Sequence, residues 1–110
     1  MENKKIESYL GFCVRSGKIL YGVDDIEKHR KKVFLIIVDE ALGESSLKKI
    51  LKAQERLCCP LLTATEGVLP AALHKPAVKA VAIKEKNLAT AILSVAESDS
   101  QFKLYSGGNN

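Results

Sequence analysis

Two adjacent carboxylates, Asp24 and Asp25, follow Gly22 and stand directly before the basic segment 28–32. The glycine breaks a short extended piece, and either acid can then open a helix that runs to about Lys31. In such a helix the acids complement the positive end of the helix dipole, and the basic residues complement its negative end. The pattern therefore predicts a short helix whose two ends carry opposite charges.

A second basic segment comprises His74, Lys75 and Lys79 and flanks a predicted loop. The formal net charge of the chain is +4, a mild basic excess that permits an anionic partner such as RNA. Solvated helix ends explain such charges equally well. Aromatic residues make up only 5% of the chain, so bases are not expected to stack on a sheet face. An RNA partner would have to be read by helix ends and loops.

Asp39 and Glu40 follow a strongly apolar segment, a position where α/β folds often hold active residues. Capping of the next helix by these acids is the better explanation, and His74 stands alone in its loop. No Ser-His-Asp grouping, GxSxG, GxGxxG or GxxxxGK[ST] pattern occurs. We therefore expect no enzyme activity, and a catalytic site built from Asp39, Glu40 and His74 is a minor alternative.

The chain has three cysteines, Cys13, Cys58 and Cys59. An odd number with one adjacent pair is a poor disulfide framework, because a bridge between neighbouring cysteines is strained. No CxxC occurs and there are only two histidines, so no metal site is expected. Reduced thiols in the cytoplasm fit best, with both Cys58 and Cys59 in the core. No apolar run approaches the roughly 20 residues of a membrane span.

Apolar spacing predicts helices and strands that alternate along the chain. Ile6, Leu10 and Cys13 recur at helical spacing, whereas the β-branched run 33–38 is typical of a strand that is buried on both faces. Thr65 is the predicted N-cap of a short helix. Helices are expected at residues 3–15, 24–31, 47–58, 65–73 and 88–95, and extended segments at residues 18–21, 33–38, 59–63 and 78–83.

This alternation predicts an α/β fold, a three-layer αβα sandwich with helices on both faces of a small four-stranded mixed sheet. The length of 110 residues fits one domain, and 46% hydrophobic residues suffice for a core without metal or disulfides. We place the domain at residues 1–98. Residues 99–110 are polar and rich in Gly and Asn, and are predicted to form a flexible C-terminal tail.

Four segments, taken in order, carry a resemblance to a known family. They are LGFCVRSGKILYGVDDIEK, VFLIIVDEAL, CCPLLTATEGVLPAAL and HKPAVKAVAI, within roughly residues 4–96. The first resembles a helix that ends in a basic-Gly-Lys segment before a glycine and an RNA-reading helix. The others resemble a buried strand with an acidic loop, a strand opened by proline with a short helix, and a variable loop with the last strand. The set is similar to the kink-turn-binding ribosomal proteins, the group of L-seven-Ae and L-thirty-e, and most of all to their small bacterial stand-alone members.

The resemblance implies an αβα sandwich that binds sharply bent, structured RNA with tandem sheared G·A pairs, ribosomal RNA included. The reading helix of the family carries the pattern Gly-x-Asn-Glu-x-x-Lys. Gly22, Asp24, Asp25 and Lys28 occupy those positions in this chain. In the family the acid accepts hydrogen bonds from a guanine edge, and the lysine contacts the backbone or a base.

The resemblance also implies contacts from the loop before the last strand and from the segment before the glycine. In the family that loop packs on a flipped base. The corresponding residues here are Leu73, His74, Lys75 and Pro76. Gly17 and Lys18 belong to the basic-Gly-Lys segment, and Lys18 is expected to bind phosphate.

The chain departs from the family pattern at Asp24, where relatives have an amide or, in bacteria, often Lys or Glu. Pro70 also stands where relatives often have a small, flexible residue. Carboxylates near RNA oppose the electrostatic attraction that dominates affinity. A protein-interaction module on the same fold, with Asp24 and Asp25 only as helix-capping acids, is therefore the alternative. We expect a cytoplasmic monomer with no cofactor and no binding to DNA or membranes.

Overall fold

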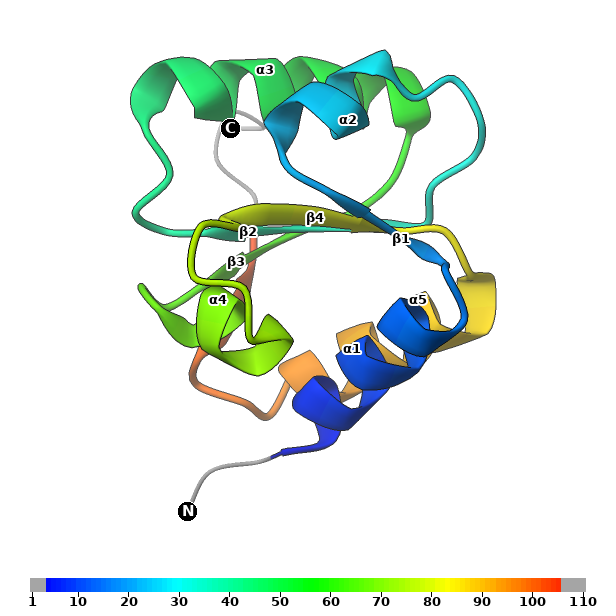
Figure 1. The fold of residues 1–110 in the computed structure, drawn as a ribbon, viewed down its shortest axis with the longest axis vertical. Helices are drawn as coiled ribbons and strands as arrows, with labels where there is room; N and C mark the ends of the chain where they lie inside the picture. The colour runs from blue at the N-terminus through cyan, green and yellow to red at the C-terminus, as the bar shows by residue number, and fades with distance from the viewer. Residues whose placement is uncertain (1–3, 106–110) are drawn as a thin grey trace.

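The computed structural model describes residues 4–105, in which five helices and five strands alternate along the chain (Figure 1). In chain order they are α1 (Lys5–Arg15), β1 (Ile19–Tyr21), α2 (Val23–Lys28), β2 (Leu35–Asp39), α3 (Glu44–Leu57), β3 (Leu61–Ala64), α4 (Val68–Leu73), β4 (Ala80–Ile83), α5 (Lys86–Ala96) and β5 (Phe102–Leu104). The predicted α/β class is confirmed. The prediction of four strands is wrong, because a fifth strand follows the last helix.

The strands form one mixed sheet in the order β1-β4-β2-β3-β5. β2 and β3 are parallel, whereas the pairs β1–β4, β2–β4 and β3–β5 are antiparallel. β4 lies between β1 and β2, so β1 pairs with a strand from the far end of the chain. Ile19 lies opposite Ile83, and Tyr21 lies opposite Val81.

Helices cover both faces of the sheet, as the three-layer prediction requires (Figure 1). α2 and α3 lie on one face, and α1, α4 and α5 lie on the other. Ile36 packs with Ile26 on the first face, and its neighbour Ile37 packs on the second face with Ile92. Successive side chains of a strand point to opposite faces, so β2 is buried throughout, as its apolar run predicts. In the described part of the chain, no helix is long and apolar enough to span a membrane.

α1 ends at the predicted glycine. Gly17 has φ +70°, and its N–H donates to the carbonyl of Val14 at 3.1 Å. The N–H of Lys18 donates to the carbonyl of Cys13 at 2.9 Å. Together the two bonds form a Schellman motif, which satisfies the last helical carbonyls and turns the chain into β1.

α2 is shorter than predicted and begins differently. It ends at Lys28 rather than near residue 31, and its N-cap is Gly22, with φ +89° and ψ +157°. That backbone conformation is essentially restricted to glycine. Asp24 and Asp25 therefore lie in the first turn rather than at the cap, and no side chain caps this end of the helix.

Residues 99–105 are part of the fold rather than of a flexible tail. Phe102–Leu104 form β5, which pairs with β3, and Phe102 is buried in the core. Asp99 shapes the preceding turn by accepting a hydrogen bond from the N–H of Gln101 at 2.9 Å. Residues 106–110 of the predicted tail lie outside the described residues.

Two predicted local details are also wrong. Cys58 is exposed rather than in the core, because it lies at the C-cap of α3 in the left-handed region with φ +55°. Cys59 is buried, as predicted. Thr65 does not cap α4 with its side chain; its backbone carbonyl accepts a hydrogen bond from Val68, and Gly67 is the N-cap.

Candidate nucleic-acid interface

The residues predicted for the site fall at the two ends of β1, an edge strand of the sheet. Gly17 and Lys18 precede the strand, and Gly22 follows it. The carbonyl of Lys18 accepts a hydrogen bond from the N–H of Lys84 at 2.8 Å. The N–H of Gly22 donates to the carbonyl of Ala80, also at 2.8 Å. β4 therefore holds Gly17 and Lys18 apart from Gly22, one group at each of its own ends.

Gly22, where β1 ends, belongs to a region that we call the loop end. The loop end comprises Gly22, the first turn of α2 and the loop 74–79 between α4 and β4. Besides the bond from Gly22 to Ala80, a second contact joins its parts. The Nζ atom of Lys75 lies 5.1 Å from the centre of the Tyr21 ring, within cation–π range. The structure thus brings Gly22 and Lys75 together, although they are distant in sequence.

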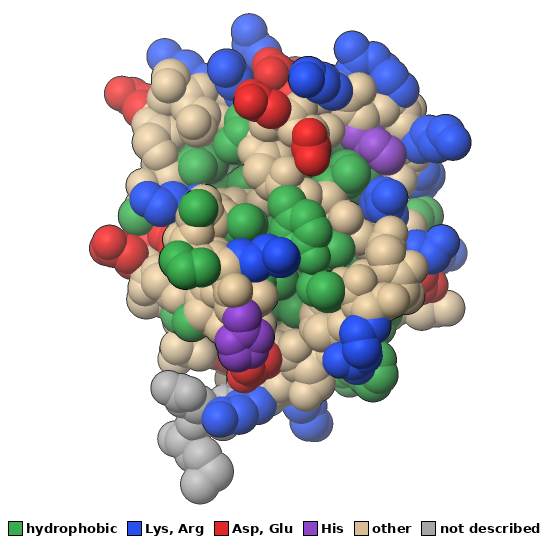
Figure 2. All heavy atoms as spheres, in the orientation of Figure 1, with side chains coloured by type: hydrophobic (Ala, Val, Ile, Leu, Met, Phe, Trp, Pro, Cys, Tyr) green, Lys and Arg blue, Asp and Glu red, His purple; other side chains and the backbone are tan. Residues whose placement is uncertain are grey.

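Two carboxylates are exposed at the loop end. Asp24 and Asp25 lie in the first turn of α2, and within residues 4–105 neither forms an ion pair. Figure 2 shows Asp and Glu side chains gathered near α2, with hydrophobic side chains in the centre of this face. A ligand at this end meets unneutralised carboxylate oxygens, which can accept hydrogen bonds from amino or imino groups.

The loop 74–79 begins with a strained residue. His74 has φ +56°, and the N–H of Lys75 donates to the carbonyl of Pro70 at 3.0 Å, which closes α4 with a Schellman motif. Leu73 is only 7% exposed and belongs to the core. Of the four loop residues predicted to contact RNA, His74, Lys75 and Pro76 are exposed, whereas Leu73 has almost no surface to offer.

A pocket of about 460 Å³ opens beside this loop. Pro70, Ala71 and Pro76 give it apolar walls. Its charged and polar groups come from Asp39, Glu66, His74 and Lys79. Mostly apolar concavities with a few polar groups are typical of ligand sites. Pro70, which departs from the family pattern, is thus part of the pocket wall.

Two acids next to the pocket have structural roles. Asp39 is buried; its Oδ1 accepts from the N–H of Ala41 at 2.7 Å, and its Oδ2 accepts from the N–H of Gly67 at 2.9 Å. Glu40 accepts through Oε2 from the N–H of Glu66 at 3.1 Å. The prediction that these acids cap the next helix is wrong, because no side chain caps α3. Instead they brace the turn that leads into α4.

The catalytic alternative requires Asp39, Glu40 and His74 to meet in one pocket. Asp39 and His74 do line the same pocket, whereas Glu40 is not among its lining residues. Both oxygens of Asp39 already accept backbone hydrogen bonds, so this carboxylate is poorly placed to take a proton from a substrate.

The other predicted residues, Gly17 and Lys18, lie among cations where β1 begins. We call this region the cationic edge and define it by Lys18, His29, Arg30, Lys31, Arg56 and Lys84. Lys and Arg side chains gather on the right-hand side of the view in Figure 2. In Figure 1 this is the side where α2 leads toward β2. The predicted phosphate ligand Lys28 is the last residue of α2 and is exposed between the loop end and this region.

Two arginines hold the C-terminus of α2. The Nη2 atom of Arg56 donates to the carbonyls of Ile26, Glu27 and His29 at 3.4, 3.0 and 2.9 Å. Arg30 donates through Nη1 to the carbonyl of Glu27 at 3.2 Å. The last carbonyls of a helix lack partners inside it and carry partial negative charge, so guanidinium groups are favourable there.

His29 is partly buried within the cationic edge. Its Nε2 atom is buried and has no hydrogen-bond partner within residues 4–105. Burial, followed by the charges of Lys84, Lys31 and Arg56, lowers the pKa of His29 from its ordinary value of 6.5. His29 is therefore mostly neutral at pH 7, and the positive charge comes from the lysines and arginines around it.

Sequence reasoning missed three residues of these two regions: Tyr21, Arg56 and Lys84. Lys84 reaches the site only through the antiparallel pairing of β1 with β4, and Tyr21 meets Lys75 only in the folded chain. Arg56 reaches it through the packing of α3 beside α2. The position of Tyr21 next to Gly22 is the one local signal that pointed to any of them.

The buried thiols are not reactive centres. Cys13 and Cys59 are both buried, which raises the pKa of each to about 11. The nearby Glu85 adds to the shift at Cys13, and Cys58 adds to the shift at Cys59. Both thiols are therefore protonated at pH 7. In the described residues, no group of three or more His, Cys, Asp or Glu could hold a metal ion.

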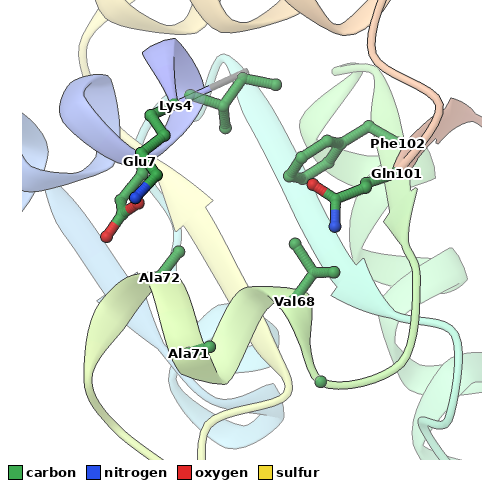
Figure 3. Close-up of a pocket in the computed structure, with 9 residues that line it drawn as sticks. Lys4, Glu7, Val68, Ala71, Ala72, Gln101 and Phe102 are labelled. Atoms are coloured by element: carbon green, nitrogen blue, oxygen red, sulfur yellow. The ribbon is translucent and has the colours of Figure 1, made fainter. Parts of the chain in front are cut away.

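A second pocket, of about 260 Å³, lies where the start of α1, α4 and the segment before β5 meet (Figure 3). Lys4, Glu7 and Gln101 supply its polar groups, and Phe102 is part of its apolar wall. Ala71 lines this pocket as well as the first one. It contains none of the residues predicted for the site.

No protein-family model and no curated protein matches this chain significantly. A solved structure of a protein of unknown function from Bacillus halodurans is similar to it, with a TM-score of 0.75 and 21% sequence identity. The match covers 84% of this chain and 97% of that chain. At this identity, the likeness supports a shared fold.

Proposed function

We propose that this chain is a cytoplasmic RNA-binding protein of the kink-turn-binding ribosomal protein family, acting as a monomer without catalysis or a cofactor. Its proposed ligand is sharply bent structured RNA, such as a segment of ribosomal RNA. One observation carries the proposal: Gly22, the first turn of α2 and the loop 74–79 meet at one end of β4. The hydrogen bond from Gly22 to Ala80 joins them. A helix start beside a loop is the arrangement that the resemblance requires.

In the proposed complex, the helix start reads a base edge. Asp25 is exposed and has no ion pair within the described residues, so a guanine displaces no protein partner when it donates to this carboxylate. A Cβ atom on Gly22 would meet no heavy atom within 4 Å, so the space above its backbone is open for the close approach of RNA. Lys28, at the exposed end of α2, binds a phosphate.

The loop side of the interface takes a base that the bend displaces. The pocket beside Pro70, Ala71 and Pro76 offers apolar walls to a flat ring. His74 lines this pocket and can donate or accept a hydrogen bond at the edge of the base. The exposed Lys75 lies next to it for the adjoining phosphate.

Titration of a labelled kink-turn RNA and of a straight duplex of equal length, at moderate salt, tests the proposal. We expect tighter binding of the kinked RNA. Asp25→Asn should reduce the preference for G·A pairs, and Lys28→Ala should weaken binding about fivefold to tenfold through the loss of one phosphate contact. Glu97→Gln and Lys49→Ala are matched controls at exposed positions elsewhere and should bind as the parent does.

Equal affinity for the two RNAs would overturn the proposal. If the kinked RNA is preferred but Asp25→Asn and Lys28→Ala both bind as the parent does, the interface lies on another face of the molecule.

Asp24 and Asp25 favour a second candidate, a protein-interaction module on the same fold. Within residues 4–105 these two exposed carboxylates form no ion pair, so together they make an acidic patch that repels phosphates and suits a basic protein segment. A double substitution, Asp24→Asn with Asp25→Asn, separates the two functions. In the RNA-binding protein it alters the preference for kinked RNA, whereas in the interaction module it abolishes binding of a lysine-rich peptide.

A further inference from the structure

The cationic edge is assembled from four segments of the chain, which contribute Lys18, residues 29–31, Arg56 and Lys84. Antiparallel pairing places Lys18 beside Lys84, since neighbouring strands are about 5 Å apart. Lys31 and Arg56 lie close enough to His29, together with Lys84, to lower its pKa. Cations that are distant in sequence therefore converge on this edge of the molecule.

No acidic side chain of the described residues neutralises the lysines of this edge. Within residues 4–105, Lys18, Lys31 and Lys84 form no ion pair. Glu85 adjoins Lys84 in sequence, but its carboxylate caps α5 by accepting from the N–H groups of Leu88 at 2.7 Å and Asn87 at 3.1 Å. Glu27 on α2 and Glu55 on α3 are exposed and are also close in sequence to residues of the edge.

The arginines of the edge have a structural role at the end of α2, whereas its lysines have none within the described residues. Arg30 and Arg56 bind carbonyls at the C-terminus of α2, which accounts for their positions. Lys18 and Lys31 are exposed and Lys84 is partly exposed, and none of their ammonium groups has a protein partner within the described residues. They are therefore available to an external anion without breaking any contact of the fold.

The composition of the edge favours a nucleic-acid backbone over a protein. A protein–protein interface needs apolar anchors at its centre. The large exposed apolar side chains of the described residues are Phe12, Val14 and Leu104, on α1 and β5, and none belongs to the cationic edge. An array of phosphates needs only closely spaced cations.

We infer that the cationic edge binds the sugar–phosphate backbone of an RNA duplex, as a surface separate from the loop end. The inference rests on the proposed function for its class of ligand, RNA. It adds that a bent RNA is held at two places: the bend at the loop end, and one helical arm along Lys18, Lys31 and Lys84. Because it reads only the backbone, the edge also binds a straight duplex.

The test uses a straight RNA duplex of about 20 base pairs, which displays phosphates but no bend. The edge variant carries Lys18→Gln, Lys31→Gln and Lys84→Gln. The matched control carries Lys48→Gln, Lys49→Gln and Lys103→Gln, which remove the same charge from α3 and from β5 at the opposite edge of the sheet. Affinities are measured for both proteins and the parent at several salt concentrations, with thermal melts to confirm folding.

We expect the edge variant to bind the straight duplex roughly 10- to 100-fold more weakly at moderate salt. The slope of log K against log salt should become shallower by about 2 to 3, since each lost phosphate contact removes about 0.9. The control should lose no more than about threefold, the effect of lower net charge alone. Each single substitution should show about a third of the change in slope.

Three results would overturn the inference: equal losses in the edge variant and the control, an unchanged edge variant, or a parent protein that does not bind the straight duplex at low salt. Poly-glutamate serves as a second probe, for an acidic protein partner. If the edge variant loses binding to poly-glutamate but binds the duplex as the parent does, the inference is also overturned, in favour of an acidic protein partner. Failure of this inference can be distinguished from failure of the proposed function. If the parent shows no preference for kinked RNA while the edge variant still loses duplex affinity, the proposed function fails and the inference stands.

Discussion

The two ends of β1 are built by different means. The loop end depends on backbone shape: Gly22 and His74 have positive φ angles, and a pocket lies beside them. The cationic edge depends on side-chain charge, and none of its six defining residues has a positive φ. β4 supports both: the carbonyl of Ala80 accepts a hydrogen bond from Gly22 at one end, and the N–H of Lys84, just after the strand, donates to Lys18 at the other.

Because of this difference, we expect the loop end to select between ligands and the cationic edge to attract polyanions. A shaped end with few cations can discriminate between ligands, but it adds little to the attraction between a protein and a polyanion. A charged edge without a pocket attracts any duplex and loses affinity steeply as salt increases. The following predictions test that division, in order of decreasing expected effect.

Gly22→Ala should lower the free energy of unfolding by about 1–3 kcal/mol, because alanine does not adopt the backbone conformation of this residue without strain. Gly11→Ala is the control within α1. There alanine meets only the flexible end of Arg15, at 3.3 Å, and should stabilise the helix by about 0.5–1 kcal/mol. Chemical denaturation measures both. Destabilisation by the two changes to the same degree would contradict a shape-dependent loop end.

Arg56→Ala should lower the free energy of unfolding by about 1 kcal/mol, because three carbonyls at the end of α2 lose a charged donor that is itself exposed to solvent. Arg56→Lys keeps the charge but not the forked geometry, and should lose most of that stability. Lys52→Ala, one turn earlier on the same helix, should change it by less than about 0.3 kcal/mol. Full stability of Arg56→Lys would show that charge alone is sufficient there.

His74→Gly should raise the free energy of unfolding by about 0.5–1 kcal/mol, because glycine adopts φ +56° without a steric penalty. Cys58→Gly, with φ +55° outside the site, should stabilise the protein by a similar amount. A larger gain in the free energy of unfolding for His74→Gly than for Cys58→Gly would mean that the loop end is more strained than an ordinary helix end. A gain at Cys58 with a loss at His74 would show that the histidine side chain makes a stabilising contact.

The smallest effect is a pH dependence at the cationic edge. The folded-state pKa of His29 lies below its ordinary value of 6.5, so the neutral ring is favoured by folding. Its contribution is fully present above pH 6.5 and is lost as the pH falls through the folded pKa. Between pH 7.5 and 5.5, the melting temperature of His29→Gln should therefore fall less than that of the parent. Parallel pH profiles would show that the surrounding cations do not act on the ring.

Local patterns were sufficient to predict the layers of this fold. The apolar run of β2 predicted a strand buried on both faces, and the glycine after α1 predicted its left-handed end, because both signals lie within a few residues. β5 was missed because it has three residues, of which only Phe102 is buried, so it shows no alternation. Cys58 was misplaced because helical spacing does not reveal that the helix ends one residue earlier.

The candidate site was less predictable than the fold. Gly22 and Lys28 were found because the family pattern lies within seven consecutive residues. The cations near Lys18 and His29 were not found, because Lys84 reaches Lys18 only through strand register and Arg56 reaches His29 only through helix packing. Leu73 was assigned to the surface because loop membership does not show which side chain turns into the core.

The insertion of β4 between β1 and β2 has a consequence for the order of folding during synthesis. A strand that pairs with a distant partner cannot form early, since a long loop must close first. Neither end of β1 is completed until Ala80 to Lys84 have been translated and have left the exit tunnel. A nascent chain that stops before these residues should carry segment 17–28, which we propose to face RNA, without the strand that holds it in place. Binding competence would therefore arise only after residue 84 has emerged.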